Sequence, residues 1–238
     1  MLFYTNKLLC YDILPMEAIK ENIQAVLADL PQHVRLVAVS KFHPKEAIEA
    51  AYSAGHRIFG ESRVQELQEK KPILPDDIEW HFIGHLQPNK VKYIAPYVSL
   101  IHAMDSEKLL REIDKQGKKV GRRIPCLLQV HVAKEETKFG FLPDELKHIL
   151  SSCDWKSLSY AKISGMMCMA TFTDDEEQIR QEFKTANSLF EEIKKAYFAE
   201  DADFCIKSWG MSDDYHIAIE EGSNMIRVGT RIFGARQY

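Results

Sequence analysis

The feature that most constrains the fold is a strict alternation between two kinds of segment along the chain. Short apolar, β-branched runs alternate with longer amphipathic stretches rich in Glu, Lys and Ala. This alternation is typical of parallel strands joined by crossover helices. The first run, VRLVAVS at 34–40, is continuously apolar after Arg35, as expected for a strand buried on both faces.

The pattern predicts eight strands, at 34–40, 57–60, 79–84, 98–103, 125–132, 162–169, 204–208 and 225–228. It also predicts a leading helix at 16–30 and one helix after each of the first seven strands. Ser106 or Asp105 would cap the helix after the fourth strand, and Thr173 or Asp174 the helix after the sixth. Unbroken alternation favours a closed (β/α)₈ TIM-type barrel with an extra N-terminal helix over an open doubly wound sheet, which usually has fewer strands.

Length and composition agree with a single barrel. The chain has 238 residues, close to the roughly 250 of a typical barrel, and its 45% hydrophobic content allows a sizeable core. No linker rich in Pro, Gly or Ser interrupts it. We therefore expect one domain at 16–238, monomeric, preceded by an N-terminal extension at 1–15 that is too weakly cationic for a signal peptide.

Charge and cysteine usage exclude several classes of protein. The net charge of −4, without a basic block, argues against nucleic-acid binding, and no apolar run approaches the ~18 residues of a membrane span. The five cysteines are scattered, so neither a disulfide framework nor a zinc site is expected. His81 and His85 lack a third ligand for a metal. We expect a reduced, cytoplasmic setting, with Cys126, Cys168 and Cys205 as small core residues.

Functional residues are expected at the C-terminal ends of the strands, where barrel enzymes have their active sites. Lys41 directly follows the first predicted strand. A partly desolvated lysine has a lowered pKa and becomes nucleophilic toward aldehydes. Position alone does not distinguish this role from that of an ordinary solvated lysine at a strand end.

Two loops near the C-terminus suit an anion. In SWGMSDD at 208–214, Gly210 permits a tight turn, and Ser212 lies near a helix N-terminus, whose free N–H groups bind phosphates. Gly229 and Thr230 follow the eighth strand and offer backbone N–H groups and a hydroxyl. Phosphate sites in such barrels are often built from the loops after strands 7 and 8, although these residues also suit an ordinary turn and cap.

Arg227 lies inside the apolar run at 225–228 and is expected to point into the barrel. A buried guanidinium requires an acceptor. That acceptor would be either a carboxylate in a structural ion pair or the ring nitrogen of a bound ligand.

Six segments together resemble the pyridoxal phosphate homeostasis protein family, which shares its fold with the N-terminal barrel of alanine racemases. They are AVSKFHP, IFGESRVQE, WHFIGHLQPNK, EETKFG, SWGMSDDYHIAIEEGS and MIRVGTRIFG, in this order between about Val34 and Arg236. The resemblance implies that the cofactor is pyridoxal 5′-phosphate (PLP), held by Lys41 as a Schiff base, the internal aldimine. It also implies roles for other residues: phosphate binding by Ser212, Gly229 and Thr230, a pyridine-nitrogen contact by Arg227, and a place on the barrel wall near the cofactor for His81.

Some positions depart from the family's pattern. Ser62 stands where the family usually has Asn, so a cofactor contact from this strand end would have a shorter reach. Trp209 stands where Met is usual and is bulkier beside the phosphate loop. His131 and Lys134 replace the usual Asn and Gly, which would alter access at the cofactor mouth.

Three functions fit these residues: a PLP carrier in intracellular vitamin B6 homeostasis without robust turnover, a PLP-dependent racemase-like enzyme, and a barrel enzyme that acts on a phosphorylated metabolite without PLP. Racemisation needs an acid and a base on opposite faces of the substrate α-carbon, and racemases take one of them from a second domain and a partner chain. Only a few residues follow the eighth strand. An Arg at the ring nitrogen would also leave that nitrogen unprotonated and weaken the electron sink. Both points favour a carrier, with the apo forms of PLP enzymes as its acceptors.

Overall fold

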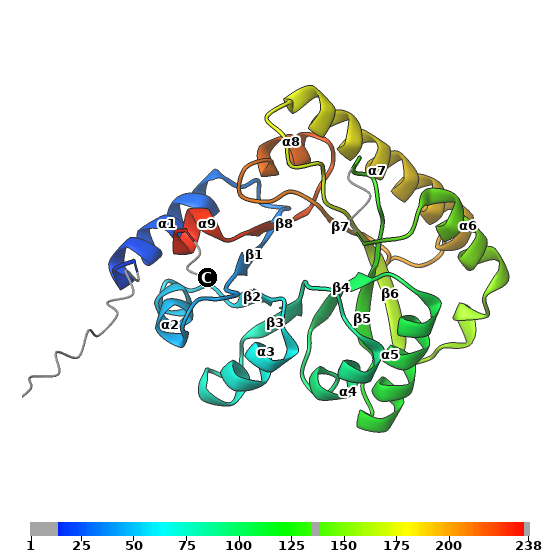
Figure 1. The fold of residues 1–238 in the computed structure, drawn as a ribbon, viewed down its shortest axis with the longest axis horizontal. Coiled ribbons are helices and arrows are strands. Elements are labelled where there is room, and N and C mark those ends of the chain that lie inside the picture. The colour runs from blue at the N-terminus through cyan, green and yellow to red at the C-terminus, as the bar shows by residue number, and fades with distance from the viewer. Residues whose placement is uncertain (1–13, 135–138, 236–238) are drawn as a thin grey trace, which may run out of the picture.

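The structure, a computed structural model, describes residues 14–134 and 139–235. Its parallel strands close into a barrel, which confirms the predicted fold class (Figure 1). Pairing of β8 with β1, with Arg35 opposite Met225 and Ala38 opposite Val228, closes the ring. The strands are β1 (Arg35–Val39), β2 (Ile58–Glu61), β3 (Glu79–Phe82), β4 (Leu100–Met104), β5 (Ile124–Gln129), β6 (Ala161–Met167), β7 (Ile206–Ser208) and β8 (Met225–Val228).

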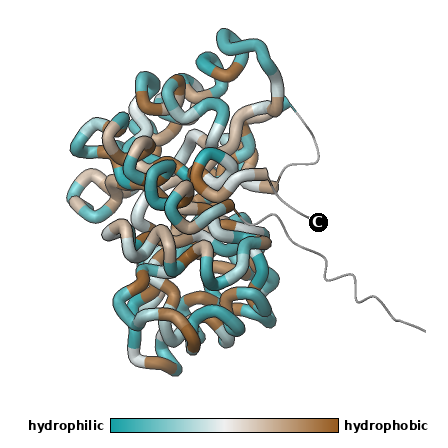
Figure 2. Tube along the Cα trace, turned by 90° about the vertical axis from the view of Figure 1, so that its left-hand side faces the viewer, coloured by the Kyte–Doolittle hydropathy of each residue, from teal (hydrophilic) through white to brown (hydrophobic). Residues whose placement is uncertain are grey.

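Helices surround the barrel, and brown and teal alternate along them in Figure 2, as amphipathic segments require. The predicted extra N-terminal helix is present and packs beside the last one, so both ends of the described chain lie on one side (Figure 1). None of the helices within the described ranges is long and apolar enough to cross a membrane. The helices are α1 (Met16–Asp29), α2 (Lys45–Ser53), α3 (Val64–Lys70), α4 (Val91–Ile94), α5 (Glu107–Val120), α6 (Pro143–Ser152), α7 (Glu176–Tyr197), α8 (Tyr215–Glu220) and α9 (Thr230–Phe233), with 3₁₀ turns at Lys71–Ile73, Pro88–Lys90 and Trp155–Ser157.

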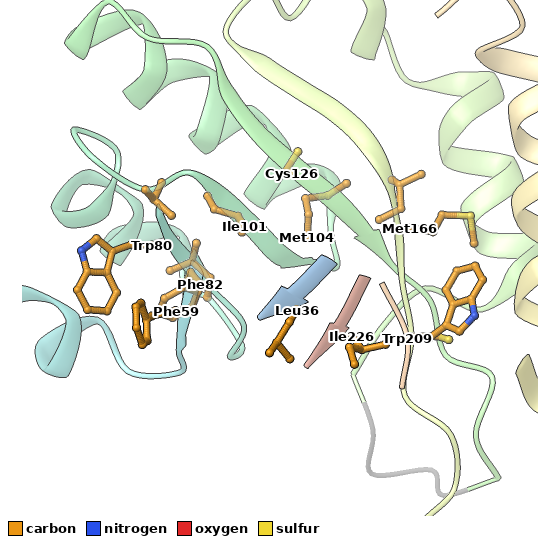
Figure 3. Close-up of a cluster of buried hydrophobic side chains, with 14 of the residues drawn as sticks. Leu36, Phe59, Trp80, Phe82, Ile101, Met104, Cys126, Met166, Trp209 and Ile226 are labelled. Carbon is orange, nitrogen blue, oxygen red and sulfur yellow. The ribbon is translucent and has the colours of Figure 1, made fainter. Parts of the chain in front are cut away.

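Successive side chains of each strand point alternately outward, toward the helices, and inward, into the barrel, so the strands are buried on both faces. Leu36 of β1 and Ile226 of β8 are paired and contribute to the outer core, between barrel and helices (Figure 3). The next residue, Val37, belongs to a smaller cluster of apolar side chains from several strands, which fills the barrel interior: Val37, Leu100, Ala103, Leu127, Met167 and Met225. The alternation therefore decides which strand residues can reach the interior of the barrel.

One glycine is required for closure. Gly165 of β6 has φ +151°, and a Cβ there would lie 2.0 Å from the carbonyl oxygen of Ile206 on β7. Only glycine allows the two strands to approach this closely.

Several predicted boundaries were wrong. The strand expected at 204–208 begins at Ile206, because the N–H of Phe204 closes a turn onto the oxygen of Asp201 (3.1 Å). The helix expected from Pro88 is a 3₁₀ turn followed by the single turn α4, after which Pro96 cannot supply an N–H. The short helix α9 was not predicted.

Two predictions about individual residues were also wrong. Neither Thr173 nor Asp174 caps α7; the side chain of Asp175 does so and accepts from the N–H of Gln178 (3.1 Å). Cys205 is exposed and is not a core residue. The predicted helix cap Ser106 is confirmed, because its side chain accepts from the N–H of Leu109.

Candidate functional site

Lys41 follows β1 at the C-terminal mouth of the barrel and is half-buried. Ser40, just before it, is fully buried and bonds outward to Glu61 of β2. By the alternation of β1, position 41 falls in register with the inward-facing Val37, and Lys41 itself lies in the turn that follows the strand. Ser62 follows β2, the strand paired with β1, and is half-buried at the same mouth.

The pairing of β1 with β8 brings the predicted anion-binding residues to this mouth. Since Ala38 lies opposite Val228, Gly229 comes beside Val39, and a Cβ on Gly229 would lie 3.2 Å from the carbonyl oxygen of Val39. The N–H of Gly229 donates to Oγ of the buried Ser212 (3.2 Å). Because this oxygen accepts from the backbone, its own O–H remains able to donate to a phosphate oxygen.

Thr230 is exposed and is the first residue of α9, immediately after Gly229. Ser212 precedes α8 by three residues, in a loop that turns at Gly210 (φ +94°). The loop is held by Asp214, whose Oδ1 accepts from the N–H of Met211 (2.5 Å). Burial raises the pKa of this carboxyl above its ordinary value. The loops after β7 and β8 thus meet through Ser212 and Gly229.

Arg227 points into the barrel, as predicted, and is only 5% exposed. Its Nη1 donates to the backbone oxygen and to Oγ of Ser208 (both 2.7 Å), and its Nη2 donates to the backbone oxygen of Cys168 (3.0 Å). Burial lowers the pKa of the guanidinium. Within residues 14–134 and 139–235 it forms no ion pair with a carboxylate, and these three acceptors are all neutral.

His81 also faces the barrel interior, and it connects to Arg227 through two further side chains. His81 Nδ1 lies 3.0 Å from His102 Nε2, and His102 Nδ1 lies 3.0 Å from Oγ of Ser208. Burial lowers the pKa of His81 to about 3 and that of His102 well below its ordinary value, so both rings are neutral. His81 itself lines a hollow at the opposite, N-terminal end of the barrel.

The donors along this chain can be assigned. Arg227 has no acceptor atom, so Ser208 Oγ accepts from it and is left with one proton to donate to His102 Nδ1. His102 Nε2 then carries a proton and donates to His81 Nδ1. Sequence reasoning missed Ser208 and His102. Their signal was a polar residue two positions after an inward-facing apolar one, Leu100 for His102 and Ile206 for Ser208.

Two hollows border these elements without including the mouth residues. One, of about 710 Å³, lies outside the barrel beside α2 and α3 and is lined by Phe42, Arg63, Glu66 and Lys70 among others. The other, of about 450 Å³, is the N-terminal hollow. Neither is lined by Lys41, Ser212 or Thr230, so the candidate site rests on strand register and hydrogen bonds rather than on cavity size. Among the described residues, no group of His, Cys, Asp or Glu is arranged to hold a metal ion.

The chain belongs to the class of proteins with an alanine racemase N-terminal domain. The family model of that description, "Alanine racemase, N-terminal domain", matches residues 15–237. An alanine racemase from Bartonella henselae has a TM-score of 0.70 at 15% identity over 93% of this chain and 59% of its own, a likeness of fold alone.

The chain belongs to the pyridoxal phosphate homeostasis protein family. Proteins of that name from Aquifex aeolicus and Helicobacter pylori (strain ATCC 700392 / 26695) are 38% and 39% identical to it, over 86% and 84% of this chain and 88% and 87% of theirs. PipY from Synechococcus elongatus PCC7942, solved with PLP bound, has a TM-score of 0.83 and is 35% identical, over 91% of this chain and all of its own.

Proposed function

We propose that the chain binds PLP at the C-terminal mouth of the barrel, linked to Lys41 as a Schiff base, and acts in PLP homeostasis without robust turnover. The observation that carries the proposal is the β1–β8 register, which brings the end of β1, two residues before Lys41, beside Gly229 and its partner Ser212. The family and the PLP bound to PipY support the choice of cofactor. When bound, PLP supplies an aldehyde that captures amines and a ring that withdraws electrons.

The residues present fit this cofactor. Gly229 leaves the space that a side chain would fill against Val39, and the Ser212 hydroxyl is able to donate to the phosphate together with Thr230. We assign Arg227 to the pyridine nitrogen, and Ser62 and His81 to the surroundings of the ring, His81 through His102 and Ser208.

The position assigned to Arg227 favours binding of PLP over catalytic turnover. Arginine keeps its proton in proteins and offers only N–H donors, so it can donate to a neutral ring nitrogen but cannot accept from a protonated one. The ring nitrogen beside it therefore stays unprotonated, and the ring withdraws electrons less strongly. A carrier of this kind would deliver PLP to apo forms of PLP enzymes. Cys126, Cys153 and Cys205 form no disulfide, which supports the expected cytoplasmic setting. We also propose a monomer.

The test is an absorption spectrum of the protein with PLP, followed by borohydride reduction and peptide mapping. We expect the reduced adduct on Lys41 and its loss in Lys41→Ala. Lys45→Ala is the matched control, because Lys45 is an exposed lysine four residues further on. An adduct that persists in Lys41→Ala would refute the assignment. Amino-acid racemisation at rates ordinary for PLP enzymes would favour the racemase-like alternative instead.

A further inference from the structure

A buried cluster of three charged side chains lies directly behind the turn that carries Lys41. Glu61, the last residue of β2, is fully buried, and Lys70, the last residue of α3, is 7% exposed. Lys70 Nζ donates to Oε1 of Glu61 (2.8 Å) and to Oε1 of Glu66 (2.6 Å). These residues come from the segment IFGESRVQELQEK, and none of them belongs to the proposed PLP-binding set.

The cluster holds both neighbours of Lys41. Ser40 Oγ donates to Glu61 Oε1 (2.6 Å), and Lys70 Nζ donates to the backbone oxygen of Ser40 (3.0 Å). On the other side, the backbone N–H of Phe42 donates to Glu66 Oε1 (2.7 Å). The peptide units before and after Lys41 are therefore both fixed from the outer side of β1.

The turn itself needs such support. Phe42 has φ +66°, the left-handed region, and it is the only residue besides glycine with a positive φ in the described part of the chain. A residue with a Cβ persists in this conformation only where its surroundings hold it, and such positions concentrate at functional sites. The guanidinium of Arg63 lies 4.7 Å from the centre of the Phe42 ring and covers it. The left-handed turn thus depends on contacts from α3 and the residue before it.

The cluster depends on the charge of Lys70. Burial raises the pKa of Glu61 to about 7, and the nearby Lys70 is the main influence that lowers it again. Glu61 Oε2 is buried and has no hydrogen-bond partner. Removing Lys70 would therefore raise the pKa of Glu61 further and take away the shared donor to Glu61, Glu66 and the backbone oxygen of Ser40, which disfavours the native geometry.

We propose that Lys70, Glu61 and Glu66 are positioning residues that orient the Lys41 amine and so set its reactivity toward an aldehyde. The inference rests on the proposed function, since that function makes Lys41 the residue that captures PLP. The three residues act through the backbone of Ser40 and Phe42.

Two variants test the proposal, and a third tests rescue. Lys70→Met and Glu66→Ala should weaken PLP binding by about tenfold or more, since displacing a reactive group by an ångström is enough for such losses. Glu66→Gln keeps a carbonyl oxygen for the N–H of Phe42 and should stay within about threefold of the wild type. The control is Lys162→Met, which breaks the ion pair with Asp201 (2.7 Å) and should lower stability without changing PLP affinity.

A second measurement does not require PLP. The rate at which trinitrobenzenesulfonate modifies Lys41, mapped by mass spectrometry at each pH, reports the amine's own reactivity. We expect a displaced pH–rate profile in Lys70→Met and Glu66→Ala, and a wild-type profile in Glu66→Gln and Lys162→Met. A purely stabilising role would lower the melting temperature without moving this profile.

Different failures are distinguishable. Folded Lys70→Met with wild-type PLP affinity and a wild-type Lys41 profile would overturn the inference. If Lys70→Met does not fold, the Glu66 pair decides, and equal effects of Ala and Gln would overturn it. If the wild type forms no PLP adduct, the proposed function fails, while the Lys41 profiles still decide whether the cluster positions this amine.

Discussion

Replacing Ser208 by alanine is the sharpest test of the hydrogen-bonded chain inside the barrel. The hydroxyl is fully buried, accepts from Arg227 (2.7 Å) and contacts His102 (3.0 Å). Hydrogen bonds to charged groups contribute about 1.5–3 kcal/mol, and a buried acceptor left without a donor costs about 1–3 kcal/mol. Arg227 would keep its bonds to the backbone oxygens of Ser208 and Cys168. We therefore expect Ser208→Ala to lower the free energy of unfolding by about 2–4 kcal/mol.

Ser223→Ala is the matched control. Ser223 is also almost fully buried, and its Oγ contacts only backbone oxygens, the nearest that of Trp209 at 2.7 Å. Its single proton makes one neutral hydrogen bond, worth about 0.5–1.5 kcal/mol. Urea denaturation followed by circular dichroism gives both values. In addition, PLP titration should show weaker binding for Ser208→Ala only.

The reasoning fails if the two serine variants lose the same stability, because Ser208 would then contribute no charge-assisted bond. It also fails if a double-mutant cycle of Ser208→Ala with His102→Gln shows no coupling. Residues joined in one hydrogen-bonded network are expected to couple by about 0.5 kcal/mol or more.

Three further predictions concern the scaffold. Burial lowers the pKa of His81 to about 3 and that of His102 well below 6.5. Below about pH 6.5 the unfolded chain therefore binds protons that the folded chain excludes. The free energy of unfolding should fall as the pH drops below about 6.5, by up to ~1.4 kcal/mol per pH unit for each ring. Urea unfolding between pH 7.5 and 5.5 should accordingly be less pH-dependent in His81→Gln, and parallel curves would contradict this. Gly165→Ala should prevent folding, as measured by circular dichroism, because its Cβ would lie 2.0 Å from a carbonyl oxygen of β7. Gly55→Ala is the control: a Cβ there would have no atom within 4 Å, so this variant should fold and bear only the strain of its positive φ. Asp175→Ala removes the α7 cap and should cost about 1 kcal/mol in urea denaturation, a loss that would be absent if the cap is not formed.

The barrel could be predicted from the sequence because parallel strands buried on both faces give short apolar runs, and the helices between them are long enough to be recognised. The run at 225–228 corresponds to β8 as predicted. Prediction failed where a backbone contact decided the boundary. Phe204 looks like a strand residue, but its N–H bonds to Asp201 in a turn. Such contacts depend on a neighbour's position and leave little trace in local composition.

The candidate site was predictable only in part. Lys41, Ser212 and Gly229 stand at strand ends, and position in a barrel marks such residues. Their proximity depends on the β1–β8 register, which no local pattern supplies. For Arg227, the sequence left both an ion pair and a ligand open; the described residues provide only neutral acceptors.

The neutral hydrogen-bond acceptors of Arg227 have a consequence for the proposed function. A carboxylate beside the guanidinium would satisfy it and cancel its charge, leaving little field for a ligand. Here a serine hydroxyl and two backbone oxygens orient the guanidinium, and the neutral His102 and His81 in turn orient the hydroxyl. Although Asp214 acts on Arg227 electrostatically, it forms no ion pair with it, so the guanidinium is not paired with a carboxylate. An arrangement that fixes Arg227 in this way suits the retention of an anionic cofactor more than rapid chemistry on it. Holding the ligand requires charge and position, whereas a strong electron sink would also require an acceptor that keeps the ring nitrogen protonated.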